Sequence, residues 1–84
     1  MITILYFARL REALGTSGEE LELPPEVTTV ADLMAWLAAR DEAWRQEFDG
    51  CKPLRAAVNQ ALATNGALIK DGDEVAFFPP VTGG

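Results

Sequence analysis

The residue types in this chain exclude most familiar catalytic sites. Its 84 residues include no His, one Cys and a single Ser, Ser17, so neither a Ser-His triad, nor a Cys-His pair, nor a Cys/His zinc site can be built. Carboxylates are abundant, but several lie beside turn residues, where solvated charge is expected rather than paired acid-base catalysis; these are Glu19, Glu20, Glu22 and Glu26. We therefore expect no metal site and no catalysis by the chain alone.

The C-terminal stretch suits a different kind of chemistry. Gly83 and Gly84 have no Cβ, so they fit a narrow channel, and the carboxylate of Gly84 is the least hindered in the sequence. Pro79-Pro80 holds the chain extended, and the four residues that follow reach about 13 Å when extended. The pattern predicts a globular domain of residues 1–78 and a tail of residues 79–84 that places a carboxylate inside a partner enzyme. The alternative is an ordinary frayed terminus.

Length and composition indicate one small globular domain. A hydrophobic content of 49% argues against disorder, and no apolar run approaches the roughly 18 residues of a membrane helix. The first residues lack the basic and apolar regions of a signal peptide, so we expect a cytoplasmic protein without membrane partners. A formal net charge of −6 argues against nucleic-acid binding and favours a basic protein surface as partner, although an acidic surface can also serve solubility alone.

The first part of the sequence predicts a strand, a short helix and an edge strand. Both faces of Ile2–Phe7 are largely apolar, which suits a central strand covered on both sides or one whose second face awaits a partner. A helix is expected over Ala8–Leu14, with Gly15 as its C-cap. Charged and apolar residues alternate in Glu19–Leu23, as they do in edge strands.

The middle of the sequence predicts the main helix. Thr29, followed three residues later by Asp32, is typical of a capping box at a helix start. Apolar residues then recur at helical spacing, at Val30, Leu33, Met34 and Leu37. A second, shorter helix is expected over Asp41–Phe48.

Strands joined by tight turns are expected in the last part of the domain. They are Leu54–Val58, a short extended piece up to Leu62, and Glu74–Phe78, which follows a turn at Asp71-Gly72-Asp73. Cys51 lies beside a lysine, whose ammonium could favour the thiolate and so a persulfide site. A lone Cys is more often incidental, and no other residue supports the persulfide hypothesis.

Strand parity predicts an aromatic residue at the root of the tail. Glu74 and Phe78 share one face of the last strand, and Phe77 points to the other. A face that contains Glu74 is expected to be solvated, so Phe78 should be exposed. If the first and last strands are neighbours, Leu5 and Phe7 join Phe78 in an apolar patch of the kind that marks interfaces. The alternative is a small satellite core under a loop.

Three stretches resemble a known family: Phe7–Glu12, Ala57–Gln60 and, most specifically, Asp71–Gly84. The family is the small, ubiquitin-like subunit of molybdopterin synthase, called MoaD, and the resemblance runs along the whole chain. It implies an α+β, β-grasp fold, in which a mixed sheet packs on one main helix at Val30–Arg40 and the first and last strands are parallel central neighbours. The resemblance is weakest over Asp41–Pro53.

The resemblance also implies a mechanism centred on Gly84. An ATP-using activating enzyme similar to MoeB adenylylates its carboxylate, which is converted to a thiocarboxylate and supplies sulfur to a pterin precursor inside the large, MoaE-like synthase subunit. No tightly bound cofactor is implied. In this family a hydrophobic surface, a flanking polar residue and the tail contact partners. The hydrophobic surface corresponds here to Phe7, Leu62 and Phe78, and the polar residue to Arg11. The tail contacts correspond to Pro79, Pro80, Val81, Thr82 and Gly83.

Two other functions share a Gly-Gly end. A thiamine-type sulfur carrier belongs to the same chemical class, but the aromatic-Pro-Pro stretch and the additional residues before Cys51 favour the molybdopterin carrier. A ubiquitin-like protein modifier would instead join Gly84 to lysines through isopeptide bonds. A modifier gives a ladder of high-mass conjugates in a cell extract, whereas a dedicated carrier does not.

Overall fold

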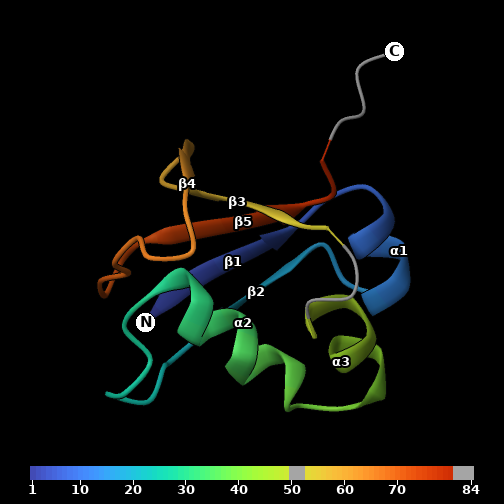
Figure 1. Cartoon of the computed structure of the whole chain (residues 1–84), viewed down its shortest axis with the longest axis horizontal. Coiled ribbons are helices and arrows are strands. Elements are labelled where there is room, and N and C mark those ends of the chain that lie inside the picture. The colour runs from blue at the N-terminus through green and yellow to red at the C-terminus, as the bar shows by residue number, and fades with distance from the viewer. Residues whose placement is uncertain (50–52, 81–84) are drawn as a thin grey trace.

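Five strands and three helices form the described part of the chain. The computed structural model describes residues 1–49 and 53–80 (Figure 1). In chain order the elements are β1 (Ile2–Tyr6), α1 (Arg9–Leu14), β2 (Gly18–Leu21), α2 (Val30–Ala38), α3 (Glu42–Phe48), β3 (Arg55–Val58), β4 (Ala61–Ala63) and β5 (Glu74–Phe78). Each helix and strand predicted from the sequence is present. Cys51 and residues 81–84 lie outside the described residues.

The strands form one mixed sheet in the order β2-β1-β5-β3-β4. β1 and β5 pair in parallel, with Ile4 opposite Val75, and the other neighbouring strands are antiparallel. The ladder extends one residue beyond β1, where the Phe7 N–H donates to the Phe77 carbonyl at 3.1 Å. This arrangement confirms the expected parallel central pair and leaves β2 at an edge, as its charged alternation predicted.

One face of the sheet packs against α2 and α3 (Figure 1). On β1 the residues alternate, with Ile2, Ile4 and Tyr6 buried while Thr3 and Leu5 are only partly covered. The buried core continues through the helices and the central strand, at Leu10, Leu14, Val30, Leu33, Leu37, Phe48, Val75 and Phe77. The protein thus has the α+β, β-grasp arrangement, with one covered and one open face of the sheet.

Local capping fixes the ends of the helices. The Asp32 N–H donates to Thr29 Oγ1 at 3.1 Å, and the Thr29 N–H donates to Asp32 Oδ2 at 3.2 Å, which confirms the predicted capping box of α2. Gly15 adopts a φ of 72° after α1, a left-handed conformation that glycine reaches without steric cost. The main helix ends at Ala38, slightly earlier than the resemblance implied.

A polar clamp, made by Tyr6, Glu19, Arg40 and Trp44, joins the helices to the sheet. The Tyr6 hydroxyl donates to Glu19 Oε2 at 2.8 Å, and the Arg40 guanidinium donates to both Glu19 oxygens at 2.7 and 3.1 Å. The Trp44 ring packs edge-on against Tyr6 and lies 4.9 Å from the Arg40 guanidinium carbon. The Arg40 hydrogen bonds hold the pKa of Glu19 below its ordinary value, and burial raises the pKa of Tyr6, so the phenol remains a neutral donor.

Glu19→Gln should lower the free energy of unfolding by about 1 to 2 kcal/mol at neutral pH, because it removes the charged acceptor of these hydrogen bonds. The folded-state pKa of Glu19 lies below its ordinary value of 4.5. The carboxylate's contribution is therefore complete well above pH 4.5 and is lost as the pH falls through the folded-state pKa. Urea denaturation at a series of pH values should show the difference between the two proteins shrinking in acid.

The control for this prediction is Glu42→Gln. It removes the ion pair to Arg45, in which both side chains are exposed, and exposed pairs contribute little to stability. Glu42→Gln should therefore change the unfolding free energy far less than Glu19→Gln does. Equal losses from the two substitutions would show that the clamp has no special role.

Candidate functional site

The face of the sheet that turns away from the helices carries a row of apolar side chains. Leu5 lies opposite Ala76, and Ala76 lies opposite Ala57 on its other side. Ala57 in turn lies opposite Leu62, which is 74% exposed. Directly opposite residues point to the same side of a sheet. The two alanines therefore leave the middle of the row flat, between a leucine at each side.

Two aromatic residues lie at the end of the open face where the tail begins. Phe7 follows β1 directly and is 46% exposed, which favours an exposed patch over the satellite-core alternative. Phe78 is half-buried rather than fully exposed, because β5 lies between β1 and β3 and has neighbouring strands on both sides. We call the apolar surface formed by Leu5, Phe7, Ala57, Leu62 and Phe78, together with Ala76, which is only 8% exposed between them, the docking face.

Polar groups bound the docking face at its other end. Thr3 on β1 lies opposite Glu20 on β2 and opposite Glu74 on β5. The Asn59 side chain accepts a hydrogen bond from the Glu74 N–H and donates one to Asp73 Oδ1, each at 3.0 Å. The open face is therefore acidic and hydrogen-bonded at one end and apolar at the other. An apolar partner surface should bind at the apolar end, which is the end next to the tail.

The tail root, Pro79 and Pro80, follows Phe78 without an intervening loop. Because β1 and β5 are parallel, the start of the tail and the start of α1 meet at the same end of the sheet (Figure 1). Both prolines are half-buried. The structure thus brings Phe7, Phe78 and the two prolines together, with Leu62 across the docking face; the predictions for Val81, Thr82, Gly83 and Gly84 lie outside the described residues.

The turn between Phe7 and α1 has an unusual backbone. Ala8 adopts φ 55° and ψ −128°, a combination that glycine reaches easily and residues with a Cβ avoid. The Ala8 carbonyl accepts the Arg11 N–H at 3.1 Å, so this strained turn sets where α1 begins relative to Phe7. Arg11, the expected polar contact, is exposed on this helix.

Ala8→Gly should raise the free energy of unfolding by about 1 kcal/mol. Relief of about 1 to 3 kcal/mol of backbone strain exceeds the roughly 0.5 to 1 kcal/mol that an added glycine costs in chain entropy. Thermal denaturation measures the change. The matched control is Ala13→Gly within α1, which should lower stability by about 0.5 to 1 kcal/mol; lower stability in both variants would mean that Ala8 carries no strain.

Sequence reasoning gave no role to Arg55 and Ala57, although it predicted their strand correctly. A period of two places both residues on one face of β3. Only the pairing of β3 with β5, in which Arg55 lies opposite Phe78, shows that this is the open face. No pattern within the strand itself carries that information.

The described residues present a surface suited to binding. Among residues 1–49 and 53–80, no group of three or more His, Cys, Asp or Glu could hold a metal ion. In the same ranges no helix is long and apolar enough to cross a membrane. The Glu19 carboxylate is held by Tyr6 and Arg40, so it is engaged in the fold. What remains is an open apolar face beside the start of the tail.

Sequence similarity extends over the whole chain. The model of the ThiS family matches residues 4–84. The molybdopterin synthase sulfur carrier subunit of Escherichia coli K12 is 45% identical over 84 residues, which cover 100% of each chain. The chain belongs to the MoaD group of the ThiS family. The family expected from the sequence is confirmed, and MoaD members are the sulfur carrier subunits of molybdopterin synthase.

Solved structures confirm the β-grasp fold of this MoaD chain. The putative molybdopterin converting factor subunit 1 of Pyrococcus furiosus has a TM-score of 0.76 and 32% identity, and the alignment covers 95% of this chain and 97% of that one. SAMP1, a small archaeal modifier protein of Haloferax volcanii, has a TM-score of 0.77 and 28% identity, with 99% and 98% covered. The same fold therefore occurs in a protein that is named a modifier.

Proposed function

We propose that this MoaD chain carries sulfur as a thiocarboxylate on Gly84 and donates it to a pterin precursor in molybdenum cofactor biosynthesis, in the cytoplasm. The observation that supports this most is the position of the docking face. Its aromatic end, at Phe7 and Phe78, leads directly into the Pro79-Pro80 tail root. A partner that covers this face is therefore placed to receive the residues that follow.

The chemistry explains why an activating enzyme is needed. A free α-carboxyl group, with a pKa near 3.3 to 3.7, is ionised at neutral pH and resists nucleophiles. Attack of the Gly84 carboxylate on the α-phosphorus of ATP releases pyrophosphate and leaves an acyl-adenylate. Hydrosulfide then attacks the carbonyl carbon, the bond to AMP breaks and AMP departs, and loss of the sulfur-bound proton to water leaves the thiocarboxylate. An enzyme similar to MoeB supplies this activation, and the chain itself contributes an unhindered carboxylate on glycine.

The docking face serves two partners in turn. The activating enzyme and the large, MoaE-like subunit must each hold the same tail, so their complexes with one chain are mutually exclusive. Apolar contacts with Phe7, Leu62 and Phe78 supply binding energy through burial, and Arg11 provides a flanking polar contact. The tail residues, Pro79 to Gly84, reach into each partner's active site.

Intact-mass measurement tests the proposed function. The chain is incubated with ATP, the activating enzyme and a sulfur source, and the expected product has one oxygen of Gly84 replaced by sulfur. Omission of ATP should abolish the change. Formation of the product by the chain with ATP and sulfur but without the activating enzyme, or no product with all components present, would contradict the proposed division of labour.

A protein modifier is the second candidate, because SAMP1 shares the fold and 28% of the aligned residues. The two functions diverge after adenylylation, since a modifier passes its carbonyl to a lysine amine and a carrier passes it to sulfur. Incubation of tagged chain with ATP and cell extract separates them. We expect thiocarboxylate and no ladder of conjugates. A second assay distinguishes a thiamine-type carrier. The sulfur-loaded chain is mixed with the purified large subunit and a pterin precursor, and only a molybdopterin carrier should transfer its sulfur to the precursor.

A further inference from the structure

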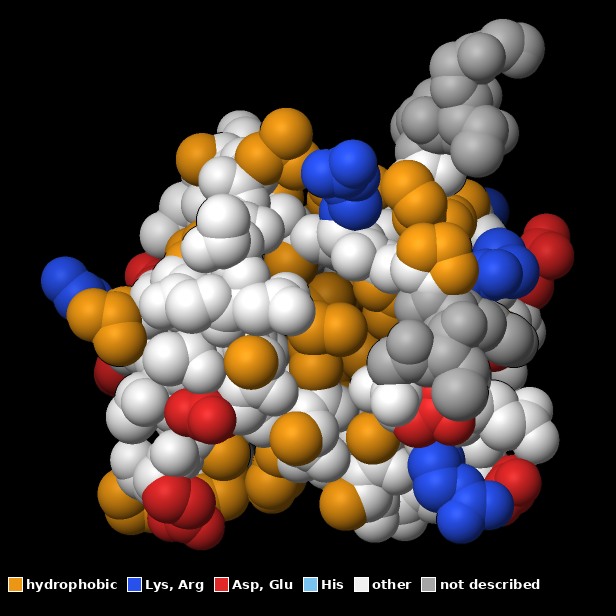
Figure 2. Space-filling model, in the orientation of Figure 1, with side chains coloured by type: hydrophobic (Ala, Val, Ile, Leu, Met, Phe, Trp, Pro, Cys, Tyr) orange, Lys and Arg blue, Asp and Glu red, His pale blue; other side chains and the backbone are white. Residues whose placement is uncertain are grey.

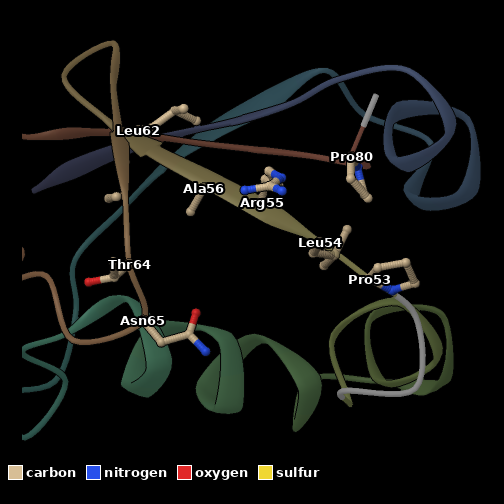
Figure 3. A pocket seen from close by; sticks show the side chains of 9 residues that line it. Pro53, Leu54, Arg55, Ala56, Leu62, Thr64, Asn65 and Pro80 are labelled. Atoms are coloured by element: carbon tan, nitrogen blue, oxygen red, sulfur yellow. The ribbon is translucent and has the colours of Figure 1, made fainter. Parts of the chain in front are cut away.

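A hollow of about 410 Å³ opens beside the docking face, between β3 and β4. Ala56 and Ala63, which lie opposite each other in these strands, line it together with Leu54. Figure 2 shows a depression with hydrophobic side chains at its bottom and a basic side chain near its rim. In Figure 3, Arg55 stands along β3 between Leu54 and Ala56, and Pro80 lies on the side of the tail. The hollow thus combines an apolar floor with a cation.

Arg55 has no acidic partner within ion-pairing distance among the described residues. The ion pairs of arginines in this part of the protein involve Arg9, Arg40 and Arg45. Arg55 is exposed, and it is the only basic residue in the five strands. In a chain with a formal net charge of −6, such a guanidinium is available to an acidic group of another molecule.

The hollow meets the docking face at the edge of the sheet, because Ala56 and Ala63 belong to the helix-covered face whereas Arg55 and Leu62 belong to the open face. Leu62 belongs to the docking face and also lines the hollow, and so does Pro80 of the tail root. Arg55 lies directly opposite Phe78 in the pairing of β3 with β5. A protein that covers the docking face and holds the tail is therefore brought over the hollow as well.

We propose that Arg55 and the hollow form an anchoring site for an acidic segment of the large synthase subunit. A carboxylate of that segment accepts hydrogen bonds from Arg55, whose planar guanidinium suits bidentate pairing, and an adjacent apolar side chain enters the hollow over Leu54. The docking face supplies apolar area, whereas Arg55 fixes orientation and speeds association. This site rests on the proposed function, because the large subunit must cover the docking face and extend over the edge of the sheet at Arg55 to reach the hollow.

The test compares Arg55→Glu with Lys70→Glu in binding titrations with the large synthase subunit. The two substitutions change the net charge equally, and Lys70 is exposed in the loop that leads into the far end of β5, so it controls for long-range repulsion. We expect Arg55→Glu to weaken binding at least about tenfold and Lys70→Glu less than about threefold. Arg55→Ala should reduce the salt dependence of binding, because one ion pair is lost.

A second variant tests the hollow without a change of charge. Thr64 is exposed on its rim, and Thr64→Trp should fill the space and weaken binding to the large subunit. Urea denaturation checks that the variants keep wild-type stability. If Arg55→Glu is destabilised, the salt dependence of Arg55→Ala decides instead.

Two results would overturn the anchoring site. One is an equal effect of the two charge reversals on binding. The other is an Arg55→Glu chain that binds the large subunit normally but no longer gains sulfur, which would assign Arg55 to the activating enzyme. Failure of the proposed function would give a different result, because the wild-type chain itself would then neither gain sulfur nor bind the large subunit. That result would also contradict the anchoring site.

Discussion

Removal of Gly84 should abolish sulfur loading and leave the free energy of unfolding unchanged. Among the described residues the hydrophobic core extends from Ile2 to Phe77 along the chain, and a terminal residue beyond the last strand is expected to contribute little to stability. The deletion moves the terminal carboxylate to Gly83, roughly 3.3 to 3.6 Å short of its normal position. Misplacement of a reacting group by even about 1 Å can cost on the order of a hundredfold in rate. Intact mass and urea denaturation of the same preparation measure the two effects.

Gly83→Val separates the shape of the tail from its length. The variant keeps every bond along the chain and the Gly84 carboxylate, but its branched side chain does not fit a channel shaped for glycine, so thiocarboxylate should again fail to form. Thr82→Val is the control, since it exchanges one β-branched residue for another and should load normally. A normal yield from Gly83→Val would contradict the narrow-channel proposal, and a clear loss of stability on deleting Gly84 would contradict a tail that is independent of the fold.

Features that depend on neighbours in sequence could be predicted from the sequence. Thr29 and Asp32 mark the start of α2 because each satisfies the other's backbone N–H. Gly15 marks the end of α1 because the chain there needs a positive φ. Both signals act within four residues, so no knowledge of the sheet is needed to interpret them. Alternation within Ile2–Phe7 separated the two faces of β1, but both faces are apolar, so it did not show that Ile2, Ile4 and Tyr6 are the buried ones.

Features that depend on strand pairing could not be predicted in the same way. The parallel pairing of β1 with β5 came from the family resemblance, because no local pattern joins residues some seventy positions apart in an 84-residue chain. Parity predicted that Phe78 lies on the open face. It could not predict how far Phe78 is buried, because that depends on the neighbouring strands on both sides of β5. Arg55 gained a role only when its pairing with Phe78 placed it beside the tail root.

Phe78→Ala should weaken association with the large synthase subunit by about ten- to a hundredfold. Burial of such a ring on a partner contributes roughly 1.5 to 3 kcal/mol, and each 1.4 kcal/mol is about a factor of ten in affinity. Phe78 is half-buried in the free protein, so part of this area is already covered and the effect should fall toward the lower end of that range. The loss of folding stability should be modest for the same reason.

Two further alanine substitutions show whether Phe78 acts in docking or in the core. Phe77 is fully buried and packs edge-on against Phe48 at 5.1 Å between ring centroids, so Phe77→Ala should cost about 3 to 5 kcal/mol of folding stability. Leu68 is 66% exposed and lies off the docking face, so Leu68→Ala should alter neither stability nor binding appreciably. Phe78→Ala should resemble neither, because it should lose binding while it keeps most of its stability. A stability loss as large as that of Phe77→Ala, or binding as tight as that of Leu68→Ala, would contradict a docking role for Phe78.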